Sequence, residues 1–169
     1  MPPQVVAEAR EAPPTAPSFA ASSVRVRIPI ETDDDVTVAG EHGRRLASRL
    51  DFSPTDVTVI ATAILEVARN VLRYARRGDL MLHLIQKRGR LGLAVVAQDK
   101  GPGIADVGQA LRDGKGVGLA SVRRLMDEFR VRSEPGRGTT VTMRKWTRCR
   151  QVERAGARRL GHAGLREVR

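Results

Sequence analysis

Two clusters of glycine near the middle of the chain constrain its fold more than any other feature. The first follows Asp99 in the run Asp-Lys-Gly-Pro-Gly-Ile, and the second forms the run Gly-Lys-Gly-Val-Gly at residues 114–118. The apolar segment 91–98 predicts a strand that ends at Asp99. Apolar residues at helical spacing follow the second cluster and predict a helix: Leu119, Val122, Leu125, Met126 and Phe129. Asp99 is therefore expected at the end of a strand, and the second cluster at the start of a helix.

These clusters are typical of a nucleotide site. Gly101 and Gly103 allow a sharp turn and leave room for a flat ligand to approach the backbone. The second cluster precedes a helix whose free N–H groups and dipole favour a phosphate, and Lys115 adds a positive charge beside them. Glycines that only form turns are the alternative, because short motifs also match by chance.

Two commoner nucleotide motifs do not fit this stretch. A P-loop requires Ser or Thr after Gly-Lys, whereas Gly116 follows Lys115. A Rossmann fingerprint requires a third glycine early in a strand-turn-helix unit, whereas Ile104, Ala105 and Asp106 follow the first cluster. A different kind of nucleotide site is therefore indicated.

A second group of residues points in the same direction. Apolar residues at helical spacing in the segment 60–74 predict a helix that carries Glu66 and Asn70 four residues apart on one side. An amide oxygen at Asn70 suits Mg²⁺, and a carboxylate at Glu66 can accept a proton from a hydroxyl or a water. A solvated helix edge is the alternative interpretation of this pair.

The remaining segments predict the order of elements. The alternation of residues 24–30, with Pro29, predicts an edge strand, and residues 36–50 predict a helix. Ser53 is expected to cap the next helix, with Asp56 completing a capping box. Hairpins are expected over 80–98 and 130–146. This order predicts an α+β fold, with a mostly antiparallel sheet and its helices on one face.

The segments Glu66-Val-Ala-Arg-Asn70, Asp99-Lys-Gly-Pro-Gly103-Ile and Gly114-Lys-Gly-Val-Gly118-Leu resemble the N, G1 and G2 boxes of the GHKL (Bergerat-fold) ATPase and kinase superfamily. Within it, the run 125–146 resembles the stressosome switch serine/threonine kinases, which are relatives of the anti-sigma factor kinases. The resemblance covers residues 24–146. It implies a two-layer α/β sandwich with a mostly antiparallel, mixed sheet.

The resemblance also implies a role for each matched position. Asp99 would bind the exocyclic amine of adenine, Asn70 would hold Mg²⁺, and Glu66 would be the catalytic base. The nucleotide site as a whole would be shaped by Asn70, Asp99, Gly101, Gly103, Ile104, Gly114, Lys115, Gly116, Val117, Gly118, Leu119 and either Thr139 or Thr140.

The chain departs from the family pattern between the two glycine clusters. Only residues 105–113 separate them, and the kinases of this family usually carry a longer, flexible lid there. A lid excludes water and brings groups onto the phosphates, so a short lid is expected to weaken nucleotide retention or transfer more than folding. Lys115 is the residue best placed to compensate.

The implied function is an ATP-dependent serine/threonine protein kinase. Its substrate would be a STAS-domain antagonist protein in a stress-response cascade that controls a sigma factor, with ATP and Mg²⁺ as cofactors. The alternative is a sequestering protein of the anti-sigma type, with nucleotide as a structural ligand or with degenerate ATP binding. Hydrolysis of ATP without a protein acceptor is disfavoured, because there is no transducer domain to use the energy. The sequence leaves the oligomeric state open, with a dimer as one option.

Composition adds a domain layout and a compartment. The Pro/Ala-rich segment 1–23 is expected to be a disordered leader, 24–146 the kinase domain and 147–169 a basic tail. No apolar run is long enough to span a membrane, and Cys149 is the single cysteine, so the cytoplasm is the expected compartment.

The formal net charge of +11 favours an acidic partner. Nucleic acid is a disfavoured partner, because only three Phe, one Trp and one Tyr are available for base stacking.

Overall fold

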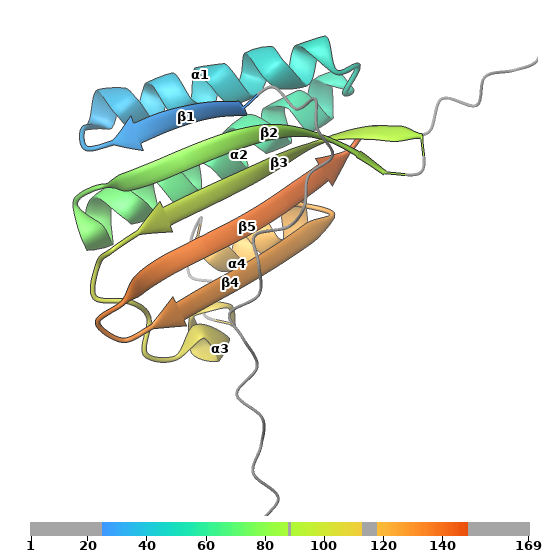
Figure 1. Ribbon diagram of the computed structural model, residues 1–169. Helices are drawn as coiled ribbons and strands as arrows, with labels where there is room; N and C mark the ends of the chain where they lie inside the picture. Colours follow the sequence, from blue (N-terminus) through green and yellow to red (C-terminus); the bar gives the residue numbers. More distant parts are fainter. Residues whose placement is uncertain (1–24, 88, 113–117, 149–169) are drawn as a thin grey trace, which may run out of the picture.

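The computed structural model describes residues 25–87, 89–112 and 118–148. A five-stranded sheet forms one layer, in the order β1-β2-β3-β5-β4 (Figure 1). Its strands are β1 (Arg25–Ile30), β2 (Gly78–Lys87), β3 (Arg90–Asp99), β4 (Glu128–Glu134) and β5 (Gly138–Trp146). The predicted edge position of the strand with Pro29 is confirmed, since β1 pairs with β2 alone.

All four strand pairings are antiparallel, so the expectation of a mixed sheet is wrong. The physical reason lies in the final hairpin. Because β5 is antiparallel to both β3 and β4, those two strands run in the same direction, but β5 lies between them. Strands that run in the same direction are therefore never neighbours in this sheet.

The helices α1 (Asp33–Arg49), α2 (Pro54–Asn70) and α4 (Leu119–Leu125) cover one face of the sheet (Figure 1). Between the two layers lies a single apolar core, which includes Val36, Ile60, Ile64, Val67, Leu80, Leu82, Leu93, Val95, Val122, Val141 and Met143. The predicted two-layer α/β sandwich is confirmed. No helix in the described ranges is long and apolar enough to cross a bilayer.

Both long helices begin at side-chain caps, of which the Ser53 cap of α2 is the predicted one. Thr32 and Asp35 form a reciprocal capping box at the start of α1. At the start of α2 the Ser53 hydroxyl accepts from the Asp56 N–H at 3.1 Å. The return contact differs from the prediction, because the Asp56 carboxylate accepts from the Ser53 hydroxyl at 2.6 Å instead of from a backbone N–H.

The helix predicted over 60–74 changes its form after Asn70. Residues Val71–Ala75 continue as one wide π-helical turn, η1. This turn ends at Arg76, which adopts a left-handed φ of 66° and donates its N–H to the Leu72 carbonyl. Turns of this kind are concentrated at functional sites.

The helix α4 is shorter than its apolar spacing predicts, and the inclusion of Met126 and Phe129 in it is wrong. The Asp127 N–H donates to the Arg144 carbonyl at 3.0 Å, and the Asp127 carboxylate accepts from the Trp146 N–H at 2.8 Å. These contacts draw the chain away from the helix and into β4. Met126 is still buried and Phe129 still packs against the core, so a strand satisfies the same pattern.

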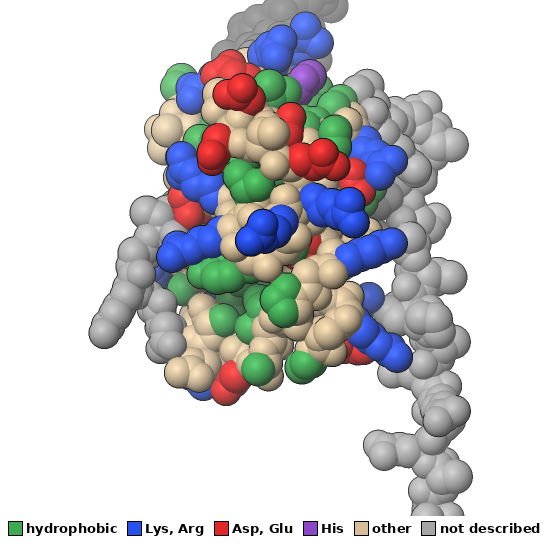
Figure 2. Space-filling view, turned by 90° about the vertical axis from the view of Figure 1, so that its left-hand side faces the viewer, with side chains coloured by type: hydrophobic (Ala, Val, Ile, Leu, Met, Phe, Trp, Pro, Cys, Tyr) green, Lys and Arg blue, Asp and Glu red, His purple; other side chains and the backbone are tan. Residues whose placement is uncertain are grey.

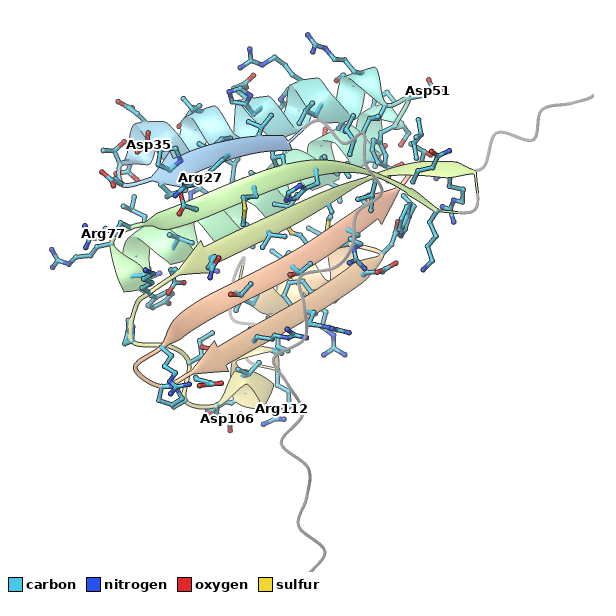
Figure 3. The ribbon with its side chains drawn as sticks, in the orientation of Figure 1. Arg27, Asp35, Asp51, Arg77, Asp106 and Arg112 are labelled. Carbon is cyan, nitrogen blue, oxygen red and sulfur yellow. The ribbon has the colours of Figure 1, made fainter. Side chains whose placement is uncertain are left out.

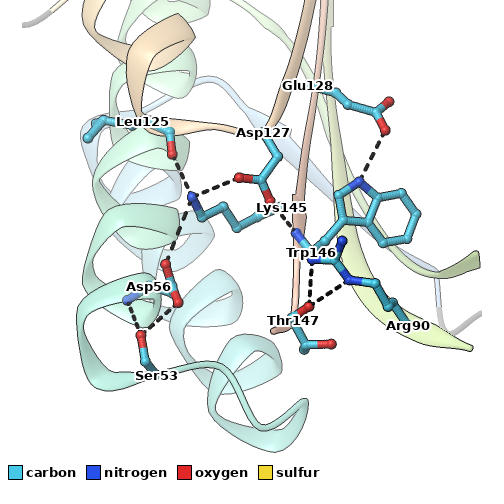
Figure 4. A network of polar contacts seen from close by, with 9 residues as sticks. All are labelled: Ser53, Asp56, Arg90, Leu125, Asp127, Glu128, Lys145, Trp146 and Thr147. Carbon is cyan, nitrogen blue, oxygen red and sulfur yellow. Dashed lines mark hydrogen bonds and ion pairs between the residues drawn. The ribbon is translucent and has the colours of Figure 1, made fainter. Parts of the chain in front are cut away.

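Lys145 joins the elements that meet at this junction (Figure 4). Its side chain is 16% exposed, and its ammonium group lies 3.0 Å from the Leu125 carbonyl, 3.1 Å from the Asp127 carboxylate and 3.8 Å from that of Asp56. The ammonium group of Lys145 therefore accounts for the last carbonyl of α4, and it links β5 to α2 and to the residue that leads into β4.

We expect Lys145→Met to lower the free energy of unfolding by about 2–4 kcal/mol, because it leaves two carboxylates and a helix carbonyl without their cation. Lys87→Met is the control, since Lys87 is 63% exposed and lies 3.9 Å from Glu128. It should cost about 0.5 kcal/mol or less. Urea unfolding of both variants measures the difference, and equal losses would contradict this role of Lys145.

Candidate functional site

Asp99, at the end of β3, is held by two backbone N–H groups. Its Oδ1 accepts from Gly101 at 2.8 Å and from Thr139 at 3.2 Å. The carboxylate is half-buried, and within the described residues its second oxygen accepts no hydrogen bond. A carboxylate fixed in this way presents one oxygen as an acceptor for an N–H donor of a ligand.

The first glycine cluster makes room for the protein's own chain, not only for a ligand. A Cβ at Gly101 would lie 2.6 Å from the Cβ of Ala75, and a Cβ at Gly103 would lie 2.2 Å from the Glu134 carbonyl oxygen. Gly103 also has a φ of +73°. Neighbouring chain segments therefore fill the Cβ positions of both glycines, and their place in a nucleotide site stays a prediction.

Ser133 is a site residue that sequence reasoning missed. Its hydroxyl accepts from the Ile104 N–H at 2.7 Å, donates to the Gly138 carbonyl at 3.0 Å and lies 2.8 Å from the Thr139 hydroxyl. The loop after β3 is thereby fastened to the β4–β5 hairpin. The signal available in the sequence was a serine five residues before a glycine in the second hairpin, which is too weak to indicate this role.

A cavity of about 510 Å³ opens beside these groups. It is lined by Gln98, Asp99, Val107, Val131, Arg132, Ser133, Glu134, Arg137, Gly138 and Thr140. The structure thus brings Asp99 and Thr140 together as predicted, while Thr139 contributes its N–H to Asp99. The size lies within the roughly 300–1,000 Å³ typical of small-molecule sites.

Glu66 and Asn70 lie at the end of α2, as predicted. Glu66 is only 8% exposed, and its Oε1 accepts from the Arg69 guanidinium at 3.0 Å. This burial excludes a solvated helix edge as the account of Glu66. Asn70 is half-buried and does not cap the turn that follows it.

The π-turn η1 connects this helix end to the Asp99 loop. Ala75 packs where a Cβ of Gly101 would stand, and Val71 lies 2.7 Å from the Cβ position of Gly78. Gly78 is the strand partner of Asp99. The end of α2 and the loop after β3 therefore belong to one packed unit.

The helix expected after the second glycine cluster begins at Leu119, with Gly118 as its N-cap. Because glycine has no side chain, the first N–H groups of α4 receive no side-chain cap from it. Gly114, Lys115, Gly116 and Val117, which we expect beside a phosphate, lie outside the described residues, as do the predicted leader and all but the first two residues of the predicted tail.

The structure describes the segment predicted to be a short lid up to Arg112. It contains α3 (Val107–Ala110), which Asp106 caps by accepting from the Gln109 N–H at 2.8 Å. Asp106 and Arg112 flank α3 at the lower end of the sheet in Figure 3. Val107 lines the cavity, so the short lid forms part of its wall.

Comparison with known families decides which kind of site this is. A family model described as "Histidine kinase-like ATPase domain" matches residues 23–145. The chain belongs to this family. The resemblance found in the three boxes is confirmed, because the matched range includes all of them.

Two relatives specify the branch of the family. The serine/threonine-protein kinase RsbT of Bacillus subtilis (strain 168) is 41% identical over 125 residues, which are 70% of this chain and 94% of RsbT. An anti-sigma F factor of Pasteuria penetrans is 30% identical over 110 residues, which are 58% of this chain and 73% of that protein. The predicted class, a serine/threonine kinase related to anti-sigma factors, is confirmed by these homologues.

A solved structure agrees in fold. The RsbU and RsbW domains of a Mycobacterium tuberculosis protein give a TM-score of 0.52 at 18% identity. The match covers 73% of this chain and 32% of that structure, so the chain spans about a third of it. At this identity the likeness concerns the fold alone.

Two glycines of one turn provide a test of the Asp99 site. Gly138 has a φ of +87°, and a Cβ there would lie 2.1 Å from the Asp99 carbonyl oxygen. Gly136, the control, has a φ of +75°, and no atom lies within 4 Å of its Cβ position. We expect Gly138→Ala to cost roughly 2–4 kcal/mol of stability and Gly136→Ala about 1 kcal/mol.

The same pair should differ in affinity for Mg²⁺–ATP, measured by calorimetry. Gly138→Ala is expected to raise the Kd by about tenfold or more, because it displaces the Asp99 backbone, whereas Gly136→Ala should leave it within about threefold. Unchanged affinity in a folded Gly138→Ala protein would contradict the placement of the nucleotide at Asp99.

Proposed function

We propose that this chain transfers the γ-phosphoryl group of ATP to a serine or threonine hydroxyl of a STAS-domain partner protein. The partner would act in a stress-response cascade that controls a sigma factor. The observation that carries the proposal is the carboxylate of Asp99, which two backbone N–H groups hold in place near the helix that carries the buried Glu66. The chain that contains them is 41% identical to a serine/threonine kinase over 94% of that kinase.

The residues at the Asp99 end fit an adenine. Asp99 Oδ1 is already occupied by the N–H groups of Gly101 and Thr139, so the other oxygen is the acceptor available to an exocyclic amine. Thr140 and Gln98 line the same cavity and add polar groups beside that acceptor. A half-buried carboxylate that meets a donor in this way favours adenine over bases that present a carbonyl there.

We assign the binding of the phosphates to the start of α4 and the binding of Mg²⁺ to Asn70. The N–H groups at the start of α4 and the side chain of Lys115 would hold the phosphates, and Asn70 would offer an amide oxygen to Mg²⁺. In the described part of the chain no group of three His, Cys, Asp or Glu side chains could hold a metal, which suits an ion bound mainly through phosphates. When bound, Mg²⁺ neutralises charge that develops on the transferred group.

Glu66 is the proposed base. Its burial keeps water away, and Arg69 holds one carboxylate oxygen, so the other can receive the hydroxyl proton of the partner. The remaining catalysis would come from positioning, which in this chain is the task of α2, the loop after β3 and α4.

A sequestering protein is the second candidate, and two observations favour it. The segment between the glycine clusters is short and folds as α3, and one relative is an anti-sigma F factor. A sequestering protein would bind its partner without forming a phosphoprotein, so a phosphotransfer assay separates the two functions. The cytoplasm and a dimer stay predictions.

Asp99→Asn should raise the Kd for Mg²⁺–ATP by about tenfold or more in calorimetry. The amide oxygen can still accept from the backbone, but its NH₂ group then faces the adenine amine with a donor. Asp106→Asn is the control, because asparagine caps a helix as well as aspartate. Equal affinities of wild type and Asp99→Asn would reject Asp99 as the adenine ligand.

Glu66→Gln should lower the rate of phosphotransfer by roughly 100-fold or more while the Kd for Mg²⁺–ATP stays within about threefold. Glutamine can still accept from Arg69 but cannot take up a proton. Glu41→Gln on the exposed face of α1, where Glu41 faces Arg44 at 3.8 Å, removes the same charge away from the site. Transfer retained by Glu66→Gln would exclude Glu66 as the base.

A further inference from the structure

An exposed group of arginines follows the Glu66 helix. The segment 69–77, which we name the arginine turn, contains Arg69, Arg73, Tyr74, Arg76 and Arg77. All four arginines are exposed, and Tyr74 is 62% exposed. Figure 2 shows basic side chains gathered across the middle of this face, below a group of acidic ones, and Arg77 projects from the same side in Figure 3.

The charges of this turn are largely uncompensated. Arg27 on β1 is paired with Asp79 through two contacts of 2.8 Å. By contrast, Arg73, Arg76 and Arg77 form no ion pair with any described residue, and Arg73 lies 5.6 Å from the centre of the Tyr74 ring. Several like charges within nine residues repel one another, so a ligand of opposite charge would relieve them.

The backbone is left-handed where the turn ends. Arg76 caps η1 with a φ of 66°, a conformation in which glycine is the favoured residue. An arginine there costs stability relative to glycine, so replacing it by glycine can test the guanidinium without weakening the cap.

The arginine turn adjoins the proposed catalytic site. Arg69 holds the Glu66 carboxylate, and Ala75 packs at Gly101 next to Asp99. Arg73 follows Glu66 by seven positions along α2 and η1, which is roughly 10 Å along the axis. A protein bound on this surface would therefore lie beside the proposed base, Glu66.

The acidic residues near the turn distinguish between a nucleic acid and an acidic protein as its partner. Ile30 pairs with Gly78, so Glu31 lies across from Arg77, and the acidic first turn of α1 follows Glu31 in the chain. A nucleic acid backbone is uniformly negative and would be repelled where it crossed this group. A folded protein can place acidic side chains on the arginines alone.

We propose that the arginine turn is the docking surface for an acidic face of the protein substrate. This inference rests on the proposed function and names the surface that selects its partner. Arginine binds carboxylates through two parallel hydrogen bonds, and arginine and tyrosine carry a large share of the energy at protein interfaces.

The test uses the full chain and a purified STAS-domain antagonist protein from the same source. The variant Arg73→Glu with Arg77→Glu should raise the Kd for that protein, measured by calorimetry, by about tenfold or more. The control, Arg44→Glu with Arg45→Glu on α1, makes the same change of net charge and should stay within about threefold. The Kd for Mg²⁺–ATP should be unchanged in both variants.

Arg76→Gly separates docking from folding. The substitution relieves the left-handed backbone, so the midpoint of urea unfolding should stay the same or rise. The affinity for the antagonist should nevertheless fall by about threefold or more. If Arg76 had only a structural role, the substitution would not lower the affinity while the unfolding midpoint stays the same or rises.

The outcomes distinguish this proposal from the proposed function. Weakened binding in the variant together with no phosphotransfer by wild type would support docking and reject the kinase. Phosphotransfer with unaltered KM in the variant would support the kinase and overturn docking here. Docking is also overturned if both double variants lose affinity for the antagonist equally, or if wild type does not bind the antagonist. A short DNA duplex tests the rival partner: if the variant loses affinity for the duplex alone, the docking proposal is overturned as well.

Discussion

The carboxylate of Asp99 organises the functional end of the molecule. Through one oxygen it holds the N–H groups of Gly101 and Thr139, the second of which lies forty positions further along the chain than Asp99. Ser133 adds a second link between the same segments by accepting from Ile104 and donating to Gly138. Because one oxygen of Asp99 is used in this way, its orientation is set before any nucleotide binds, which reduces the entropy that binding must remove.

The residues that mark the site also hold the fold together. Gly101 and Gly103 are motif glycines, yet the atoms that a side chain would meet belong to Ala75 and Glu134. The last turn of α2 widens into η1, and this turn packs against the same loop. The helix that carries Glu66 and the loop that carries Asp99 are therefore packed together through η1.

The basic residues of the chain serve two different purposes. Lys145 is largely buried and satisfies two carboxylates and the end of α4, so its charge contributes to the fold. Arg73, Arg76 and Arg77 are exposed beside the proposed site, and Arg76 occupies a backbone conformation that glycine would adopt at lower cost. A net charge of +11 does not distinguish these purposes, whereas the contacts of each side chain do.

The sequence by itself determined the family, the order of the main elements and the cap of α2. These depend on local patterns: the three boxes, the alternation around Pro29, and Ser53 before an apolar stripe. Only the tertiary structure decided where α4 ends, that β5 separates β3 from β4, and what occupies the space beside the motif glycines. Periodicity reports which residues are buried, and Met126 and Phe129 satisfy a helix and a strand equally well. The choice depended on Asp127, Trp146 and Lys145, whose contacts join residues about twenty positions apart.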